Sequence, residues 1–189
     1  MSMELFMKKL AICIVGPDQP GIIAKISKFF VEERANIEQV AQTSLDDLFS
    51  CTYIVSVPED ITPLRLQEKM NQTVSSLSLS VVVQPYHPSL SPVTTPSQPF
   101  VVTAWGPDKK GLVAGVTEVF AQWQVNVTNL RAVFKGGNNP DENIMLYEVE
   151  IPASIEFSLV QKALKDRAYE LGIDIRLQHQ DIFYHINRI

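Results

Sequence analysis

Two copies of a six-residue turn contain the residues of this sequence that are best suited to bind a ligand. The first copy spans Gly16 to Gly21 (GPDQPG) and the second, 90 positions later, spans Gly106 to Gly111 (GPDKKG). Each turn lies between a strand-like apolar run and a helix-like run, so the first backbone N–H groups of the helix have no partner within it. Because the helix dipole adds partial positive charge there, the turn is a predicted site for an anion such as a carboxylate.

Polar side chains near each turn supply the rest of this chemistry. The aspartate of the turn could accept hydrogen bonds from the ammonium group of an α-amino acid, and the second glycine lets a small carboxylate approach the backbone. An asparagine shortly after the helix can donate to a carboxylate and accept from an amine. The alternative is a purely architectural turn, in which the aspartate caps the helix. The predicted ligand-binding residues are Asp18, Gly21, Ile22 and Asn36 in the first copy and Asp108, Gly111, Leu112 and Asn126 in the second.

The similarity between the two halves extends beyond the turns. At the same offset Phe30 corresponds to Phe120, and the register then slips by four, because Pro58 corresponds to Pro152. Self-similarity over this length indicates two homologous domains. We expect a first domain at 1–86, a Pro-rich linker at 87–98, a second domain at 99–180 and a C-terminal tail at 181–189.

The hydrophobic period predicts the same order of elements in both copies. That order, strand-helix-strand-strand-helix-strand, is typical of an α+β, ferredoxin-like fold with two helices on one face of a four-stranded antiparallel sheet. Because a sheet edge or a bare sheet face favours association, we expect paired domains and a homodimer. The predicted elements are Leu10 to Val15, Gln19 to Arg34, Asn36 to Ser44, Leu48 to Val57, Leu64 to Leu77 and Ser80 to Gln84, then Phe100 to Trp105, Lys109 to Trp123, Asn126 to Phe134, Ile144 to Ile151, Ile155 to Leu171 and Ile173 to Gln178.

Composition narrows the classes of function. The chain has 189 residues, 46% of them hydrophobic, and a formal net charge of −5 with scattered lysines and arginines, which disfavours direct binding to nucleic acid. No signal peptide, membrane span or metal-ligand spacing is recognisable, so we expect a cytoplasmic protein without cofactor or metal. The simplest interpretation of Cys13 and Cys51, which fall in strand-like runs, is a pair of buried reduced thiols. The alternative is a disulfide between neighbouring strands.

At the two turns the sequence resembles the ACT family of regulatory domains, named for aspartate kinase, chorismate mutase and prephenate dehydrogenase. The resemblance covers nearly the whole chain and implies amino-acid effectors that bind between paired domains. Asp18, Gly21 and Asn36 stand where serine-sensing members hold their ligand. Two such domains without a catalytic domain look most like the glycine cleavage system transcriptional repressor family, whereas the tail looks like the ending of small single-domain members.

This resemblance implies a non-enzymatic regulator of glycine cleavage or related amino-acid metabolism genes. We expect it to bind glycine or a serine-like amino acid and to act through a transcription factor or other regulatory protein. The alternative is a ligand-independent structural adaptor or dimerisation module for a metabolic enzyme. The sequence supports an enzymatic function least, because no nucleophile and base share a motif and no Gly-rich nucleotide loop is recognisable.

Overall fold

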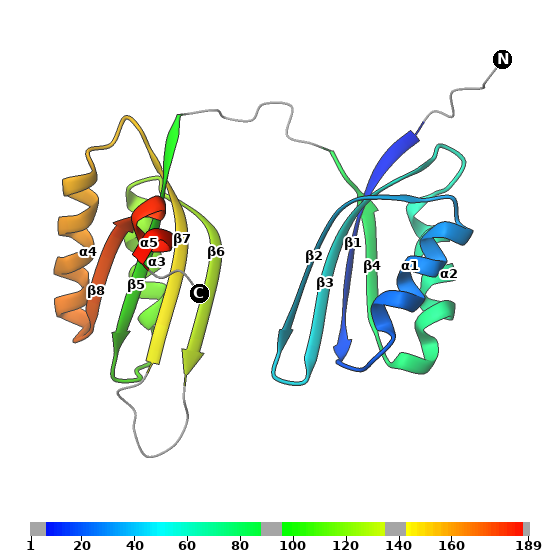
Figure 1. Cartoon of the computed structure of the whole chain (residues 1–189), viewed down its shortest axis with the longest axis horizontal. Coiled ribbons are helices and arrows are strands. Elements are labelled where there is room, and N and C mark those ends of the chain that lie inside the picture. The colour runs from blue at the N-terminus through cyan, green and yellow to red at the C-terminus, as the bar shows by residue number, and fades with distance from the viewer. Residues whose placement is uncertain (1–6, 88–95, 135–142, 187–189) are drawn as a thin grey trace. The chain divides into compact units, whose positions relative to one another are not determined.

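The structure of this chain is a computed structural model that describes residues 7–87, 96–134 and 143–186, and it contains two compact units, Met1–Leu90 and Ser91–Ile189. Figure 1 shows that each unit has its own sheet and its own helices. The first unit consists of β1 (Met7–Pro17), α1 (Ile22–Glu32), β2 (Asn36–Leu45), β3 (Leu48–Pro58), α2 (Pro63–Val74), a 3-10 turn η1 (Ser75–Leu77) and β4 (Ser80–Pro85). The second consists of β5 (Ser97–Gly106), α3 (Leu112–Gln122), β6 (Asn126–Phe134), β7 (Asn143–Pro152), α4 (Phe157–Leu171), β8 (Asp174–His179) and α5 (Gln180–Ile186).

Both sheets are antiparallel and have the same topology. The strand order is β2-β3-β1-β4 in the first unit and β6-β7-β5-β8 in the second. The first strand of each unit is therefore central, and the strands after the two helices form opposite edges. The predicted α+β fold of two tandem ferredoxin-like units is confirmed.

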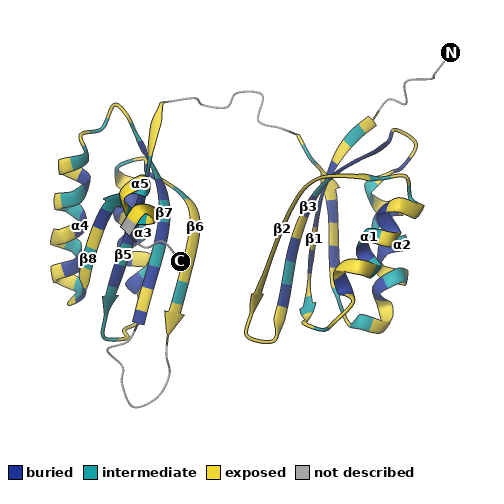
Figure 2. Ribbon diagram, viewed as in Figure 1, coloured by how far each residue is buried: buried dark blue, intermediate teal, exposed yellow. Residues whose placement is uncertain are grey.

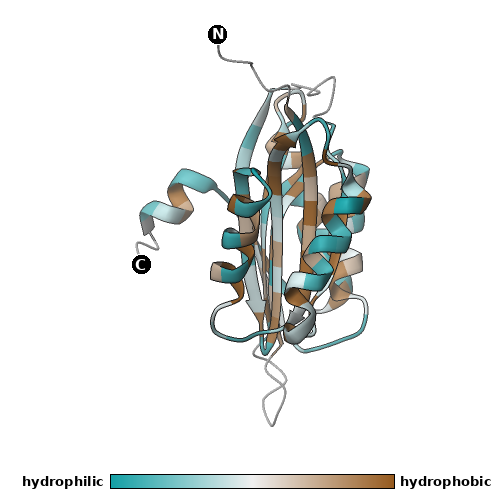
Figure 3. Cartoon of the chain, turned by 90° about the vertical axis from the view of Figure 1, so that its right-hand side faces the viewer, coloured by the Kyte–Doolittle hydropathy of each residue, from teal (hydrophilic) through white to brown (hydrophobic). Residues whose placement is uncertain are grey.

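Each core lies between one sheet face and the two helices packed on it. In the first unit the central strand buries alternate residues, among them Ile12 and Ile14, against the apolar stripe of α1 that includes Ile26 and Phe30. The second unit repeats this arrangement around Val102. Figure 2 shows buried residues on the central strands and exposed residues along β2 and β6. In Figure 3 the helices alternate hydrophilic and hydrophobic segments, as surface helices do.

The structure revises several expected boundaries. The first helices start three residues later than predicted, because Gly21 and Gly111 have left-handed dihedral angles that a helix cannot contain. The tail forms an additional short helix, α5, which the sequence did not indicate and which lies against β5 and β8. Most of the predicted linker (88–95) and the segment between β6 and β7 (135–142) lie outside the described residues.

Other expectations concern individual groups. Cys51 is buried, as expected, but Cys13 is exposed because it lies on the sheet face that carries no helices, and both thiols are free. Among the described residues, no three histidine, cysteine or acidic side chains come together as a metal site. Of the helices that the structure describes, none has the length and apolar character needed to cross a bilayer.

Candidate functional site

The two glycine turns have nearly the same backbone geometry. Gly21 has φ +92° and Gly111 has φ +91°, and each is the N-cap residue of the following helix without a side-chain hydrogen bond to it. A Cβ added at either glycine would meet no atom within 4 Å, so the glycine is required by its dihedral angle and not by crowding. The outward N–H groups at the start of α1 and α3 therefore have no side-chain cap and are open to a ligand.

The first glycine of each turn has a different role. A Cβ at Gly16 would lie 2.8 Å from the Cδ2 of Leu79 and from the carbonyl oxygen of Ser78, and a Cβ at Gly106 would lie 3.0 Å from the Cγ2 of Ile173. These glycines let the end of the central strand pass close to the segment that leads into the last strand. This packing holds each turn against the rest of its unit.

Asp18 does not cap its helix, although the sequence allowed that role. Its carboxylate accepts a hydrogen bond from the hydroxyl of Ser44, with 2.9 Å between Oγ and Oδ2, and its backbone N–H donates to the carbonyl oxygen of Asp47 at 2.7 Å. Both partners belong to the β2–β3 hairpin. The hairpin end therefore positions the turn in the first unit, a link that local sequence patterns did not reveal.

The second turn opens into a pocket. Asp108, Gly111 and Leu112 line it with Lys109, Val113, Ala114 and, from the end of β6, Phe134. The carboxylate of Asp108 has no hydrogen-bond or ion-pair partner within the described part of the chain. The predicted residues of the second turn therefore lie together around a space that a small molecule could enter, and Phe134 is a lining residue that the sequence did not predict.

Ile22 and Leu112 have core side chains. Each side chain is 2% exposed and packs in the hydrophobic core between helix and sheet, because each residue begins the apolar stripe of its helix. A ligand in either turn could therefore meet the backbone N–H of these residues but not the bulk of the side chain. Their predicted role is limited to that backbone contact.

The residue after each aspartate joins the turn to the second helix of its unit. The Nε2 of Gln19 donates to the carbonyl oxygen of Leu77 at 3.2 Å, and the Nζ of Lys109 donates to the carbonyl oxygen of Leu171 at 3.2 Å. The two acceptors end equivalent helical segments. Gln19 and Lys109 are thus equivalent in position and in function, and Lys109 stabilises a helix C-terminus.

The two predicted asparagines are the first residues of β2 and β6, and both strands begin at the end of the sheet opposite the glycine turn (Figure 1). Asn36 pairs with Ser56, which pairs with Lys9, nine residues before Asp18. At 3.3 Å per residue this corresponds to a separation of about 30 Å. The second unit repeats the arrangement, because Asn126 pairs with Glu150 and Glu150 with Pro99. The structure therefore does not bring Asn36 to Asp18, or Asn126 to Asp108, within one unit.

A β-bulge follows each asparagine, between Ile37 and Gln39 and between Val127 and Asn129. In the first unit the extra residue is Glu38, whose carboxylate accepts hydrogen bonds from Ser56 at 2.8 Å and from the amide of Asn36 at 3.2 Å. These bonds, with the charge of Lys9 at 3.7 Å, hold the pKa of Glu38 below its usual range. Glu38 thus fixes the orientation of the Asn36 amide.

Comparison with known proteins identifies the family. The sequence model of the ACT domain family matches residues 8–84 of this chain and again residues 98–178. The chain belongs to the ACT domain family. A UPF0237 protein of Methanopyrus kandleri is 37% identical over 79 residues, which are 41% of this chain and 88% of that protein. That relative therefore has about the length of a single ACT unit.

Two solved structures resemble the tandem arrangement. An unknown protein from Galdieria sulphuraria has a TM-score of 0.75 at 21% identity and covers 92% of this chain and 99% of its own. A structure named for a glycine cleavage system transcriptional repressor has a TM-score of 0.68 at 18% identity, with 91% of this chain and 96% of that one covered. At these identities the likeness shows the fold.

Proposed function

We propose that this protein is a non-enzymatic regulator that senses a small amino acid, such as glycine or serine, at its glycine turns. One observation carries the proposal: α1 and α3 both begin without a side-chain cap, directly after a left-handed glycine whose missing Cβ faces open space. The uncapped N–H groups suit a carboxylate and the neighbouring aspartate suits an ammonium group. Membership of a family of regulatory domains supports the same conclusion.

The proposed ligand site is composite. Because about 30 Å of strand separates the aspartate from the asparagine of its own unit, we expect a second copy of the chain to supply one of the two residues to a small ligand. The apolar residues exposed on the edge strands, among them Val40 and Val133, favour such association. An amino acid bound at that junction would stabilise the associated form, which is how a ligand shifts a conformational equilibrium.

The proposed regulator acts in the cytoplasm through a protein partner, in the control of glycine cleavage or related amino-acid metabolism genes. The likeness to the structure named for a glycine cleavage repressor supports this direction. A net charge of −5 argues against direct contact with nucleic acid. Both ACT units, the linker and the tail would remain together in the acting molecule.

Isothermal titration of the full chain with each of the twenty amino acids tests the proposal. We expect heat of binding with glycine, serine or alanine. Removing one charged hydrogen bond by Asp18→Ala or Asp108→Ala should weaken binding at that site by about tenfold or more. Asp166→Ala, an exposed carboxylate on α4, is the matched control and should bind as the unchanged protein does.

The second candidate is a ligand-independent dimerisation module, favoured by the same exposed edge strands. Sedimentation velocity separates the two functions. An association state that depends on amino acid supports sensing, whereas a dimer unaffected by every amino acid, together with no heat in the titrations, would leave only the module.

A further inference from the structure

In the first sheet, two of the outward N–H positions on the free edge of β4 are closed. The Oε1 of Gln67, on α2, accepts a hydrogen bond of 2.8 Å from the backbone N–H of Val83, so this N–H points away from the sheet. Alternate residues of an edge strand point their N–H groups the same way, and the next one along β4 is Pro85, which has no N–H. Such devices prevent another strand from pairing with an edge.

The second sheet lacks both devices at the equivalent positions. The offset of 94 that relates Pro58 to Pro152 also relates Gln67 to Gln161, Val83 to Leu177 and Pro85 to His179. Pairing confirms the correspondence, because Ile12 faces Val83 in one unit and Val102 faces Leu177 in the other. Within the described residues, Gln161 makes no hydrogen bond. The N–H groups of Leu177 and His179 therefore lie on an edge that no side chain closes.

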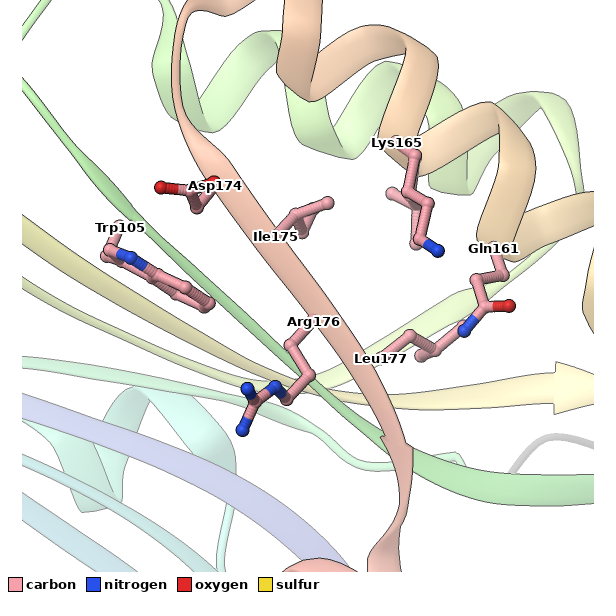
Figure 4. A pocket seen from close by; sticks show the side chains of 8 residues that line it. Trp105, Gln161, Lys165, Asp174, Ile175, Arg176 and Leu177 are labelled. Carbon is pink, nitrogen blue, oxygen red and sulfur yellow. The ribbon is translucent and has the colours of Figure 1, made fainter.

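A pocket of about 270 Å³ lies along this open edge. Figure 4 shows Lys165 and Gln161, both from α4, on one side of β8 and Arg176, Trp105 and the carboxylate of Asp174, at the start of β8, on the other. Neither Lys165 nor Arg176 has an acidic partner in the described part of the chain. The pocket therefore carries two cations and one carboxylate, so this strand edge is locally positive on a protein whose net charge is negative.

We propose that the edge of β8 binds an extended acidic segment of a partner protein, which adds to the second sheet as a fifth strand. Main-chain hydrogen bonds to Leu177 and its neighbours would hold the segment, and carboxylates on its two faces would pair with Lys165 and Arg176. Successive side chains of a strand point to opposite faces, so two acidic residues separated by two others reach both cations. This surface would be the partner-binding part of the proposed function, and it does not require the amino-acid site.

The probe is the peptide acetyl-Thr-Val-Glu-Thr-Val-Glu-Val-Thr-amide, added to the full chain at concentrations up to about 1 mM, the weak limit of specific recognition. We expect saturable binding by NMR titration, with the largest shifts and slowed hydrogen exchange at the amides of Ile175 and Leu177. The same peptide with lysine in place of glutamate should bind at least several-fold more weakly. A version N-methylated at alternate residues should not bind, because it cannot pair with the edge.

Matched variants separate charge from backbone. Arg176→Glu combined with Lys165→Glu should weaken binding by about tenfold, the sum of two partly exposed ion pairs, whereas Arg65→Glu on the exposed side of α2 should have no effect. His179→Pro copies Pro85 and should reduce binding by removing an outward N–H. His179→Ala keeps that N–H and controls for the lost side chain, which packs on Phe100.

The outcomes are distinguishable from those of the amino-acid titrations. Protection at Leu177 without heat from any amino acid would support the docking edge and reject sensing. No shift at Ile175 and Leu177, equal binding of the acidic and lysine peptides, or protection of this edge by self-association before any peptide is added would each overturn the proposal.

Discussion

The ammonium group of Lys109 donates to the carbonyl oxygen of Leu171, 3.2 Å away, at the C-terminal end of α4. Gln19 makes the same contact to Leu77 in the first unit. A neutral and a charged donor therefore perform one structural task at equivalent positions. In both units the contact joins the middle of the glycine turn to the end of the helical segment that precedes the last strand.

Lys109→Gln should leave the stability of the second unit nearly unchanged, because glutamine already makes this bond in the first unit. Lys109→Ala should lower the free energy of unfolding by about 0.5–1 kcal/mol, since the last carbonyl of α4 then loses its donor. Both tryptophans, Trp105 and Trp123, belong to the second unit, so urea unfolding followed by tryptophan fluorescence reports on that unit alone. An equal decrease in the free energy of unfolding in both variants would contradict a hydrogen-bonding role for Lys109.

Gly111→Ala should destabilise the second unit by about 1–2 kcal/mol, the cost of a left-handed residue with a Cβ. No neighbour lies within 4 Å of the added methyl group, so the effect comes from the dihedral angle alone. Gly106→Ala should cost more, because φ is +151° and the Cβ would also press on Ile173. Fluorescence-monitored unfolding would compare the two, and the reverse order would show that the turn geometry is misassigned.

Tyr53→Phe should raise the free energy of unfolding of the first unit by about 1 kcal/mol. Among the described residues the buried hydroxyl of Tyr53 makes no hydrogen bond of good geometry, and the group beside it is the thiol of Cys51, a weak acceptor. Burial, and then this contact, raise the pKa of Tyr53, so the hydroxyl contributes a desolvation cost. The matched control is Tyr147→Phe in the second unit. There the hydroxyl donates to the Sδ of Met145 at 3.4 Å, and we expect little change. Calorimetry of both variants would test this, and a marked loss of stability in Tyr53→Phe would refute it.

Acid should weaken the first unit partly through Glu38. The Ser56 hydroxyl, the Asn36 amide and Lys9 hold the pKa of Glu38 below its ordinary value of 4.5. Because the pKa is lower in the folded than in the unfolded chain, this stabilisation is complete above the unfolded value and is lost as the pH falls through the folded one. Glu38→Gln should therefore make the urea midpoint depend less on pH below about pH 4.5. Glu68→Gln, an exposed control on α2, should leave that pH dependence unchanged. Circular dichroism at several pH values provides the measurement.

The sequence alone determined the duplication, the order of the elements and the special role of the second glycine of each turn. These features depend on local properties: the apolar period separates strands from helices, and a missing Cβ lets a ligand approach the backbone at Gly21 and Gly111. The left-handed angle of both glycines, which delays the start of each helix, emerged only from the structure. The offset between the halves also makes Gln19 and Lys109 equivalent positions.

Only the tertiary structure decided which groups meet. Asp18 accepts a hydrogen bond from Ser44 and does not cap its own helix. Asn36 lies about 30 Å from the turn. Within the described residues, Gln161 lacks the hydrogen bond that Gln67 accepts from Val83. Each of these contacts joins segments far apart in the chain, and strand register and helix packing set the distances between them. No local propensity encodes such distances, so equivalent residues with the same side chain end in different roles.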